Sequence, residues 1–432
     1  MTQKLHLEIT GMPFVPGVAQ GTLQHSGVSN SNNYILLLRQ EELDYFVGSA
    51  SGFVVAEGAP FSHTMIRYMG MGVPTVIISK QQADSLQEGM VVMLNGATGL
   101  ITTNIPERNE SETETFAVPV HPLMTADGVD VYLRASVRNQ KAALQSRREG
   151  AESIGLLRSE FVIPDDGGLP DTAFYLRTLG QICEAALPLP VTIRLLDIAA
   201  DKIPLWMPAI KGIGGTLGIQ GVRLYGMEPM KRVVQAQLKA IDRLSDSYDI
   251  RVLIPYLVRY EELHHWVKFI GQHLSKPLPL GAMAETPASA LDLANWFELV
   301  DFVAIGCNDL MQCLFAADRD RAELRNYLDP YAPLLWRFMQ QIAANADTQL
   351  DKIQLCGVLA QLPGVLPILL GLGYRVFSVE AKLIPYLRQT ITSTDTADAR
   401  RLAHDICAAR ESREVLQLLG LHDESYQPFL LP

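Results

Sequence analysis

Acidic, amide and arginine side chains follow two short apolar segments in the second half of the chain. Glu285 comes directly after LGAMA, Asn308 and Asp309 come just after FVAIG, and Arg319 follows in the next loop. Carboxylates on neighbouring strand ends offer the oxygen ligands that Mg²⁺ or Mn²⁺ prefers, and a guanidinium binds anions. This stretch therefore predicts a site for a divalent metal and a phosphorylated small molecule. Loops are also acidic simply because they are solvated, so each residue taken alone has a simpler explanation.

Two further arginines accompany apolar segments of the strand type. Arg158 stands at the end of such a segment in GLLRSEF, and Arg194 lies inside one in VTIRLLD. An arginine that points inward from an apolar strand is costly unless an anion meets it. That anion is either a neighbouring carboxylate, with Glu160 and Asp197 as the candidates, or the phosphate or carboxylate of a bound ligand.

A cysteine and a histidine stand where they could take part in proton and phosphoryl transfer. Cys356 ends an apolar segment in QLCGV. This makes it a candidate proton donor, although a strand cysteine is more often an inert buried thiol. His63 ends the turn GAPFSH, at the expected start of a helix. A helix N-terminus favours an anion, including a phosphate held covalently on the imidazole, whereas a lone histidine is more often a helix-entry or core residue.

These residues need a scaffold that brings strand ends together, and the second part of the chain has the pattern of one. Strand-like segments alternate with helical patterns over residues 126–392, the size expected of a (β/α)8 TIM barrel within an α/β fold. The side chains just past the carboxyl ends of the strands line the active-site face of such a barrel. The expected strands are Val131–Ala135, Ser153–Leu157, Val191–Leu196, Arg251–Tyr256, Leu280–Ala284, Phe302–Gly306, Gln354–Gly357 and Arg375–Val379.

The regions on either side of the barrel are expected to form separate units. Residues 1–106 contain strand-like segments, a helix over Thr64–Met71 and a closing hairpin, which predicts a small α/β domain. Residues 107–125 are acidic and lack helical periodicity, and so predict a linker. Residues 393–432 predict one C-terminal helix that stops at Gly420, followed by a tail.

Composition and charge argue against several classes of protein. The formal net charge of −11 disfavours general nucleic-acid binding, which needs a basic face. The N-terminus has no apolar signal segment, and the most apolar segment, Leu362–Leu372, contains prolines and is too short to span a bilayer. The five cysteines are scattered without metal-binding spacing, which is typical of reduced thiols in the cytoplasm. We therefore expect a cytoplasmic protein that contacts neither membrane nor nucleic acid.

In order and spacing, these motifs resemble those of the phosphoenolpyruvate (PEP)-utilising enzymes, and most of all the enzyme I group of the bacterial sugar phosphotransferase system. The resemblance rests on GMPFVPGVAQG, GAPFSHTMIRYMGMGVPTVI, GLLRSEF, VTIRLLDIAADK, AETPASA, GCNDLMQCLFAADRD and LCGVLA. It implies a phosphohistidine swivelling domain in residues 1–106, a PEP-binding barrel in residues 126–392, and a homodimer formed through the barrel.

The resemblance also implies a role for each candidate residue. His63 corresponds to the histidine that receives the phosphoryl group of PEP, and Cys356 to the residue that protonates the enolate to give pyruvate. Glu285 and Asp309 correspond to the Mg²⁺ ligands. The remaining counterparts hold PEP itself, and they are Arg158, Arg194, Arg319 and Asn308.

The chain also departs from the pattern of this family. The helical subdomain that binds the carrier protein is absent after the opening segment, and the linker is short. Pro60 and Phe61 replace an arginine and a threonine before the histidine. Gln220 replaces a phosphate-binding arginine, which removes a charge-assisted contact worth about 1.5–3 kcal/mol. Val358 replaces an acidic residue.

Three functions follow from these observations. The first is Mg²⁺-dependent transfer of the phosphoryl group of PEP to His63 and then to an unidentified acceptor, with release of pyruvate. The second, which the departures favour, is a catalytically impaired relative that binds PEP and metal, or a protein partner, in a regulatory role. The third is a lyase or hydrolase acting on a PEP-like or oxaloacetate-like acid, which would have no need of His63.

Overall fold

The computed structural model describes residues 7–25, 33–39, 42–43, 50–105, 122–164, 167–198, 203–207 and 217–421, without the side chains of His63, Ala322 and Arg325. Most of the predicted linker and the last residues of the predicted tail lie outside these ranges. Within the described residues, no helix is long and apolar enough to cross a membrane.

Eight parallel strands close into the predicted barrel, in the order β10-β11-β12-β13-β14-β15-β16-β9. Seven of the strands are short and almost wholly buried, as strands covered on both faces are, whereas in β9 buried residues alternate with more exposed ones. Two of them, β13 and β14, have the predicted bounds, and the other six differ by a few residues at their ends. The strands are β9 (Tyr132–Val137), β10 (Ile154–Arg158), β11 (Val191–Arg194), β12 (Ile250–Leu257), β13 (Leu280–Ala284), β14 (Phe302–Gly306), β15 (Ile353–Cys356) and β16 (Val376–Glu380).

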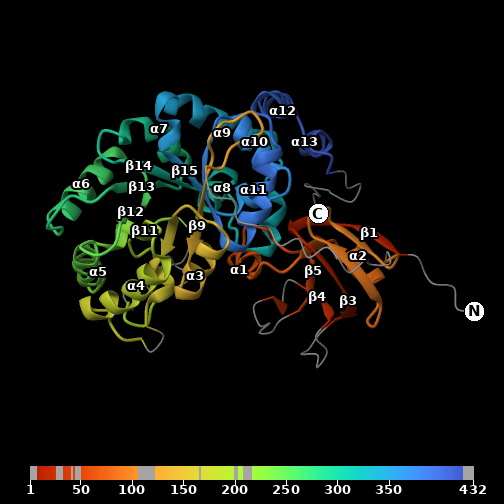
Figure 1. The fold of residues 1–432 in the computed structure, drawn as a ribbon, viewed down its shortest axis with the longest axis horizontal. Coiled ribbons are helices and arrows are strands. Elements are labelled where there is room, and N and C mark those ends of the chain that lie inside the picture. Colours follow the sequence, from red (N-terminus) through yellow and green to blue (C-terminus); the bar gives the residue numbers. More distant parts are fainter. Residues whose placement is uncertain are drawn as a thin grey trace, which may run out of the picture.

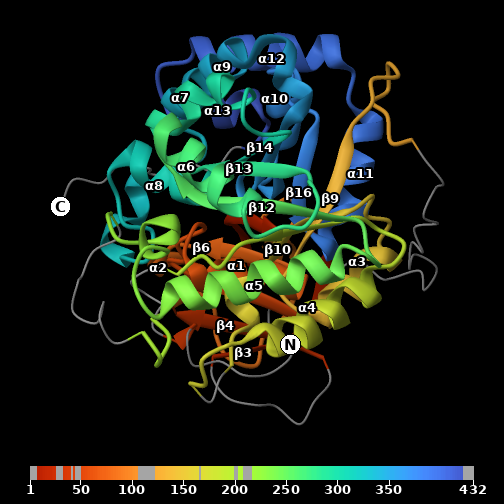
Figure 2. The ribbon, with the colours of Figure 1, turned by 90° about the vertical axis from the view of Figure 1, so that its left-hand side faces the viewer.

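Helices surround the barrel and cover the outer face of its strands (Figures 1 and 2). In α5, the buried residues Val233, Val234, Leu238 and Ile241 recur at helical spacing, so one side of the helix faces the barrel. The helices are α3 (Gln140–Arg148), α4 (Thr172–Ala186), α5 (Met230–Leu244), α6 (Tyr260–Gly271), α7 (Pro287–Trp296), α8 (Cys307–Phe315), α9 (Pro333–Ala346), α10 (Val365–Gly371) and α11 (Ile384–Ser393).

The N-terminal domain is a mixed sheet with short helices. Its strands lie in the order β1-β8-β7-β3-β4-β5-β6-β2, and the predicted hairpin is formed by β7 and β8, which pair antiparallel. The elements are β1 (Glu8–Thr10), β2 (Met12–Val15), β3 (Val18–Gln24), β4 (Tyr34–Arg39), β5 (Gly52–Ala56), α1 (His63–Met71), β6 (Thr75–Ile78), α2 (Lys80–Ser85), β7 (Val91–Asn95) and β8 (Leu100–Thr102).

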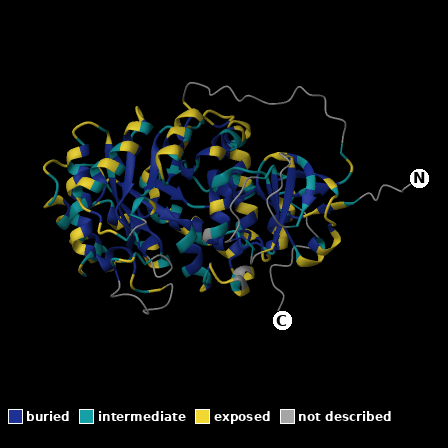
Figure 3. Cartoon of the chain, turned by 90° about the horizontal axis from the view of Figure 1, so that it is seen from below, coloured by how far each residue is buried: buried dark blue, intermediate teal, exposed yellow. Residues whose placement is uncertain are grey.

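Helix α1 lies between the small sheet and the barrel (Figure 1). Its buried residues Met65 and Met69 belong to a hydrophobic core that is continuous from the small sheet into the barrel. Lys382, which follows β16, donates a hydrogen bond to the carbonyl oxygen of Met71 at the end of α1. Buried residues fill the interiors of both domains, and exposed residues lie mainly on the outer turns of the helices (Figure 3).

The C-terminal region forms two helices, so the prediction of a single helix was wrong. Helix α12 spans Thr396–Ala408 and α13 spans Ser412–Leu418. Ala409 adopts an extended backbone that ends α12, and Arg337 on α9 donates to the carbonyl oxygens of Cys407 and Ala409, which satisfies the end of the helix from outside. The second helix stops where predicted, directly before Gly420, which has a φ of +66°.

Candidate active site

A pocket opens at the carboxyl ends of the barrel strands, and every strand contributes to its wall. The lining also includes Ile66 and Met69 from α1, so the N-terminal domain forms one side of the pocket. All the predicted barrel residues line it together: Arg158, Arg194, Gln220, Glu285, Asn308, Asp309, Arg319 and Cys356. Residues far apart in the sequence are thus brought to one place by the closure of the barrel.

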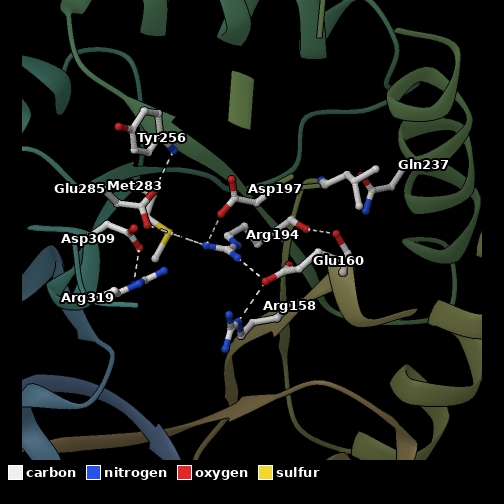
Figure 4. Close-up of polar contacts among 12 residues, drawn as sticks. Arg158, Glu160, Arg194, Asp197, Gln237, Tyr256, Met283, Glu285, Asp309 and Arg319 are labelled. Atoms are coloured by element: carbon white, nitrogen blue, oxygen red, sulfur yellow. Dashed lines mark hydrogen bonds and ion pairs between the residues drawn. The ribbon is translucent and has the colours of Figure 1, made fainter. Parts of the chain in front are cut away.

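Two arginines and two carboxylates form a buried ionic cluster at one side of this pocket (Figure 4). Glu160 Oε1 accepts from Arg194 Nη2 at 2.5 Å and from Arg158 Nε at 3.0 Å, and Arg194 Nη1 lies 2.8 Å from Asp197 Oδ2. Burial lowers the pKa of Arg158. Burial also acts against the charge of Arg194, but Asp197 and Glu160 outweigh it and raise the pKa of that arginine. Of the two kinds of anion considered from the sequence, carboxylates of the protein itself, Glu160 and Asp197, pair with Arg158 and Arg194.

Glu285 is held deep in the pocket by the elements on either side of it. The next residue, Thr286, caps α7 through a reciprocal pair of hydrogen bonds with Ser289, and Pro287 opens the helix. Glu285 is 1% exposed, and its Oε2 accepts from the backbone N–H of Tyr256 at 2.9 Å. Burial, and then the charge of Asp309, raise the pKa of Glu285 well above its ordinary value.

Asp309 and Arg319 form the opposite side of the predicted metal site. Asp309 lies in the first turn of α8, and Arg319 Nη1 meets its Oδ2 at 3.1 Å. In the described part of the chain, no group of three or more His, Cys, Asp and Glu side chains could hold a metal ion. Two carboxylates are enough for Mg²⁺, which usually takes one or two from the protein and the rest from phosphates and water. The charge of Asp309 raises the pKa of the buried Glu285, and a divalent cation would relieve this repulsion between the two carboxylates.

Asn308 and Cys356 lie next to each other in this wall of the pocket, at the ends of neighbouring strands. Asn308 Oδ1 accepts from the backbone N–H of Val358 at 3.0 Å. Cys356 is 3% exposed, and burial raises the pKa of its thiol to about 11. The cysteine is therefore protonated at neutral pH and faces the pocket, which is what a proton donor requires.

Helix α1 places the backbone of His63 at the domain junction. Ser62 caps the helix, its Oγ accepting from the N–H of Met65 at 3.3 Å, and His63 is the first helical residue. The His63 side chain lies outside what the structure describes. Ile66, one helical turn after His63, lines the pocket. Phe61, which departs from the family pattern, is 1% exposed and packs in the core under the helix.

Sequence reasoning missed several residues of the pocket, among them Tyr256, Ser378 and Glu380. Tyr256 has a φ of +48°, which is unusual for a residue with a bulky side chain and marks local strain. This conformation lets its N–H donate to Glu285. Glu380, at the end of β16, pairs with Arg138 at 2.8 Å. For Ser378 and Glu380 the available signal was their position towards the end of β16, which resembles that of Arg158, Glu285 and Cys356 at the ends of their strands.

Comparison with protein families identifies both parts of the chain. Residues 112–396 match the PEP-binding domain of the PEP-utilising enzymes, and residues 37–99 match the mobile domain of the same enzymes. The chain belongs to the PEP-utilising enzyme family. The resemblance proposed from the motifs is therefore confirmed.

Individual members of the PEP-utilising family align with most of the chain. A phosphoenolpyruvate-protein phosphotransferase from Buchnera aphidicola subsp. Schizaphis graminum is 26% identical over 91% of this chain and 73% of its own length. One from Haloferax volcanii is 28% identical over 86% of this chain and 68% of its own length. The multiphosphoryl transfer protein 2 of Escherichia coli is 27% identical over 85% of this chain and 47% of its own length.

Proposed function

We propose that this protein transfers the phosphoryl group of PEP to His63, releases pyruvate, and passes the phosphoryl group to a further acceptor. The observation that carries the proposal is the pocket itself. It combines buried arginines, carboxylates and a protonated thiol, and it is bordered by the helix that begins at His63. The names of the relatives, phosphoenolpyruvate-protein phosphotransferases, support the same reaction and a protein as the acceptor.

The positively charged and amide side chains would hold PEP. Arg158, Arg194 and Arg319 would neutralise its phosphate and carboxylate. Positioning and charge neutralisation account for most of the catalysis of phosphoryl transfer. Asn308 and Gln220 would add neutral hydrogen bonds. Because Glu160 already holds two of the guanidiniums in fixed positions, PEP would meet arginines that need no reordering.

Glu285 and Asp309 would hold a divalent cation, Mg²⁺ or in its place Mn²⁺. When bound, the metal would neutralise charge on the phosphate and on the enolate oxygen. The protein supplies carboxylates in a buried pocket and leaves the remaining ligand positions to substrate and water.

Cys356 would deliver the proton that turns the enolate into pyruvate. Its thiol keeps its proton at neutral pH because burial raises its pKa to about 11. His63 would take the phosphoryl group from the opposite domain, since an imidazole is substantially neutral and nucleophilic near neutral pH. We place the phosphohistidine domain at residues 1–106 and the barrel at 126–392, with 107–125 as linker, and we expect a cytoplasmic homodimer paired through the barrel.

Incubation with PEP labelled in its phosphate, together with Mg²⁺, tests the proposal directly. The wild-type protein is expected to acquire an acid-labile label and to release pyruvate, and the His63→Ala variant is expected to acquire none. Equal labelling of the two proteins, or no label on the wild type, would contradict the transfer.

A regulatory role is the second candidate function, and two positions favour it. Gln220 and Val358 both line the pocket with neutral side chains, so the pocket has less charge than the family pattern provides. Calorimetry with PEP and Mg²⁺ separates the two functions. Tight binding without release of pyruvate would support the regulatory role, and rapid release would exclude it.

A further inference from the structure

A chain of hydrogen bonds runs through the inside of the barrel from Cys356 towards the opposite end. Gln354 Nε2 donates to Cys356 Sγ at 3.1 Å, and Arg134 Nη1 donates to Gln354 Oε1 at 3.0 Å. Gln354 is 1% exposed. Arg134 lines a separate cavity with Arg251 and Lys352 at the other end of the strands. Neither Arg134 nor Gln354 lines the PEP pocket. Both lie inside the barrel, on the side of Cys356 that faces away from the pocket.

Arg134 determines which way the amide of Gln354 faces. A guanidinium can only donate hydrogen bonds, so the atom of the amide that it meets must be the oxygen. The amide nitrogen is thereby directed to Cys356 Sγ and to the carbonyl oxygen of Gly155, which it reaches at 3.0 Å. Both of its N–H groups are used. The sulfur accepts one of them, which leaves the thiol hydrogen to point away from Gln354.

The absence of a side chain at Gly155 leaves space for Arg134 and Gln354 inside the barrel. A Cβ atom on that residue would lie 2.7 Å from Arg134 Cβ, 2.8 Å from Gln354 Oε1 and 2.9 Å from Ser378 Oγ. Real Cβ atoms do not approach other atoms so closely. Glycine at this position therefore leaves the space that the two long polar side chains occupy inside the barrel.

We propose that Arg134 and Gln354 are positioning residues for the proton that Cys356 carries, with Gln354 holding the sulfur and Arg134 holding Gln354. The proposal deepens the proposed function and rests on it, because it takes Cys356 as the proton donor. A purely structural role, in which the pair only fills the interior, is the alternative that the test below must separate.

The chemistry explains why an N–H group behind the sulfur matters. When the phosphoryl group leaves PEP, the enolate of pyruvate remains. Its methylene carbon takes the thiol hydrogen, so a C–H bond forms, the S–H bond breaks, and the electron pair stays on sulfur as a thiolate. The N–H of Gln354 stabilises that thiolate as it develops. Water then returns a proton to the sulfur.

Other charged groups also surround Cys356, and the test must hold them constant. Arg194 favours the thiolate and Glu285 opposes it from across the pocket, and Ser378 on the neighbouring strand β16 also favours the thiolate through its hydroxyl. Cys307 lies at the end of the other neighbouring strand. Arg134 lies behind Gln354, beside Arg251. Gln354→Met keeps the length of the side chain and changes none of these charges, and it removes the hydrogen bond to Cys356 together with those to Arg134 and Gly155.

The first experiment follows the proton in the product. PEP stereospecifically labelled with tritium on its methylene carbon is turned over in deuterated water, and the configuration of the pyruvate methyl group is read. The wild type is expected to give one configuration. Gln354→Met is expected to lower the single-turnover rate of pyruvate formation about 10- to 100-fold, leave the Kd for PEP within about twofold, and give both configurations. Arg134→Met is expected to have a smaller effect in the same direction, which Arg134→Lys partly restores.

Gln237→Met is the matched control. Gln237 is also a fully buried glutamine, and its Oε1 accepts from the N–H of Leu196 at 3.0 Å on the outside of the barrel. Its replacement is expected to lower the melting temperature without mixing the product configurations. If Gln354→Met gives the wild-type configuration and a single-turnover rate like that of the control, the pair is structural and the proposal is overturned.

The second experiment needs no turnover, so it keeps the proposal distinct from the proposed function. The rate of alkylation of Cys356 by iodoacetamide, followed by peptide mass spectrometry at about pH 9, reports the thiolate fraction. Removing an N–H donor from the sulfur is expected to raise the thiol pKa and slow alkylation about tenfold in Gln354→Met. An unchanged rate would overturn the proposal. If Gln354→Met slows alkylation but the wild type makes no pyruvate from PEP, the positioning of Cys356 by Gln354 is supported and the phosphotransferase function is refuted.

Discussion

Glu160 holds both Arg158 and Arg194, for which the sequence offered it and Asp197 as candidate partners. A single oxygen, Oε1, accepts from both Arg158 and Arg194, and the residue is 8% exposed. Two guanidiniums buried side by side repel each other unless an anion lies between them. The carboxylate of Glu160 therefore makes the arrangement stable before any ligand arrives.

Replacing this charge should be costly in the absence of ligand. Glu160→Gln leaves two buried guanidiniums without their shared anion, and we expect the free energy of unfolding to fall by about 3 kcal/mol, measured by denaturant titration. PEP should recover part of the loss, because its own charges meet the same arginines. The control is Glu228→Gln, which breaks an exposed pair with Arg232 and should change stability by about 0.5 kcal/mol or less. Equal losses in the two variants would contradict the role of Glu160.

Asp197 gives the site a pH dependence of its own. Burial raises its pKa to about 6 from an ordinary value of 3.8, although Arg194 opposes the rise. The folded protein thus holds this proton more strongly than the unfolded chain, so the contribution to stability is complete at low pH and is lost as the pH rises through about 6. Relative to Asp197→Asn, the wild type should lose about 2 kcal/mol between pH 4 and 7. Asp246→Asn, at an exposed position, should show no such divergence in the same unfolding experiments.

Among the structural elements, the ends of strands could be predicted from the sequence, whereas the backbone conformation of Tyr256 and the break between α12 and α13 could not. The bounds of β13 and β14 could be read from the sequence because both are short apolar segments followed at once by polar residues. Those polar residues included the predicted carboxylates. Tyr256 could not be found this way, since its contribution is a backbone N–H set by a positive φ. Neither could the break between α12 and α13, because the groups that end α12 come from α9.

The break in the C-terminal helix provides a prediction at this scale. Arg337→Met removes the donor that satisfies the carbonyl oxygens of Cys407 and Ala409. We expect a loss of about 1–2 kcal/mol in the free energy of unfolding. Arg401→Met on the outer side of α12 removes an exposed arginine whose partner is Asp398, and it should cost less than about 0.5 kcal/mol. A cost for Arg337→Met no larger than that of the control would show that α12 ends without help from α9.

For the whole molecule, the decisive feature is that the N-terminal domain docks against the mouth of the barrel. Ile66 and Met69 of α1 complete the wall of the candidate active-site pocket, and Lys382 donates a hydrogen bond to the carbonyl oxygen of Met71 at the end of the same helix. Gly72 makes this approach possible, because a Cβ there would overlap the Lys382 side chain. Helix α1 therefore lies against the barrel in this structure, and the contact at Lys382 connects it to the end of β16, beside the pocket.

The hydrogen bond between Lys382 and Met71 is expected to affect phosphoryl transfer to His63 but not the binding of PEP. Lys382→Met removes the hydrogen bond to Met71 without changing any residue that lines the pocket. Loss of one charge-assisted hydrogen bond should slow labelling of His63 by PEP about tenfold, while the Kd for PEP, measured by calorimetry, should stay within about twofold. Lys276→Met is the matched control, because Lys276 also donates to a backbone carbonyl oxygen, that of Ser245, on the far side of the barrel. It should alter neither quantity. If Lys382→Met labels at the wild-type rate, the docked arrangement of α1 is not what delivers His63 to PEP.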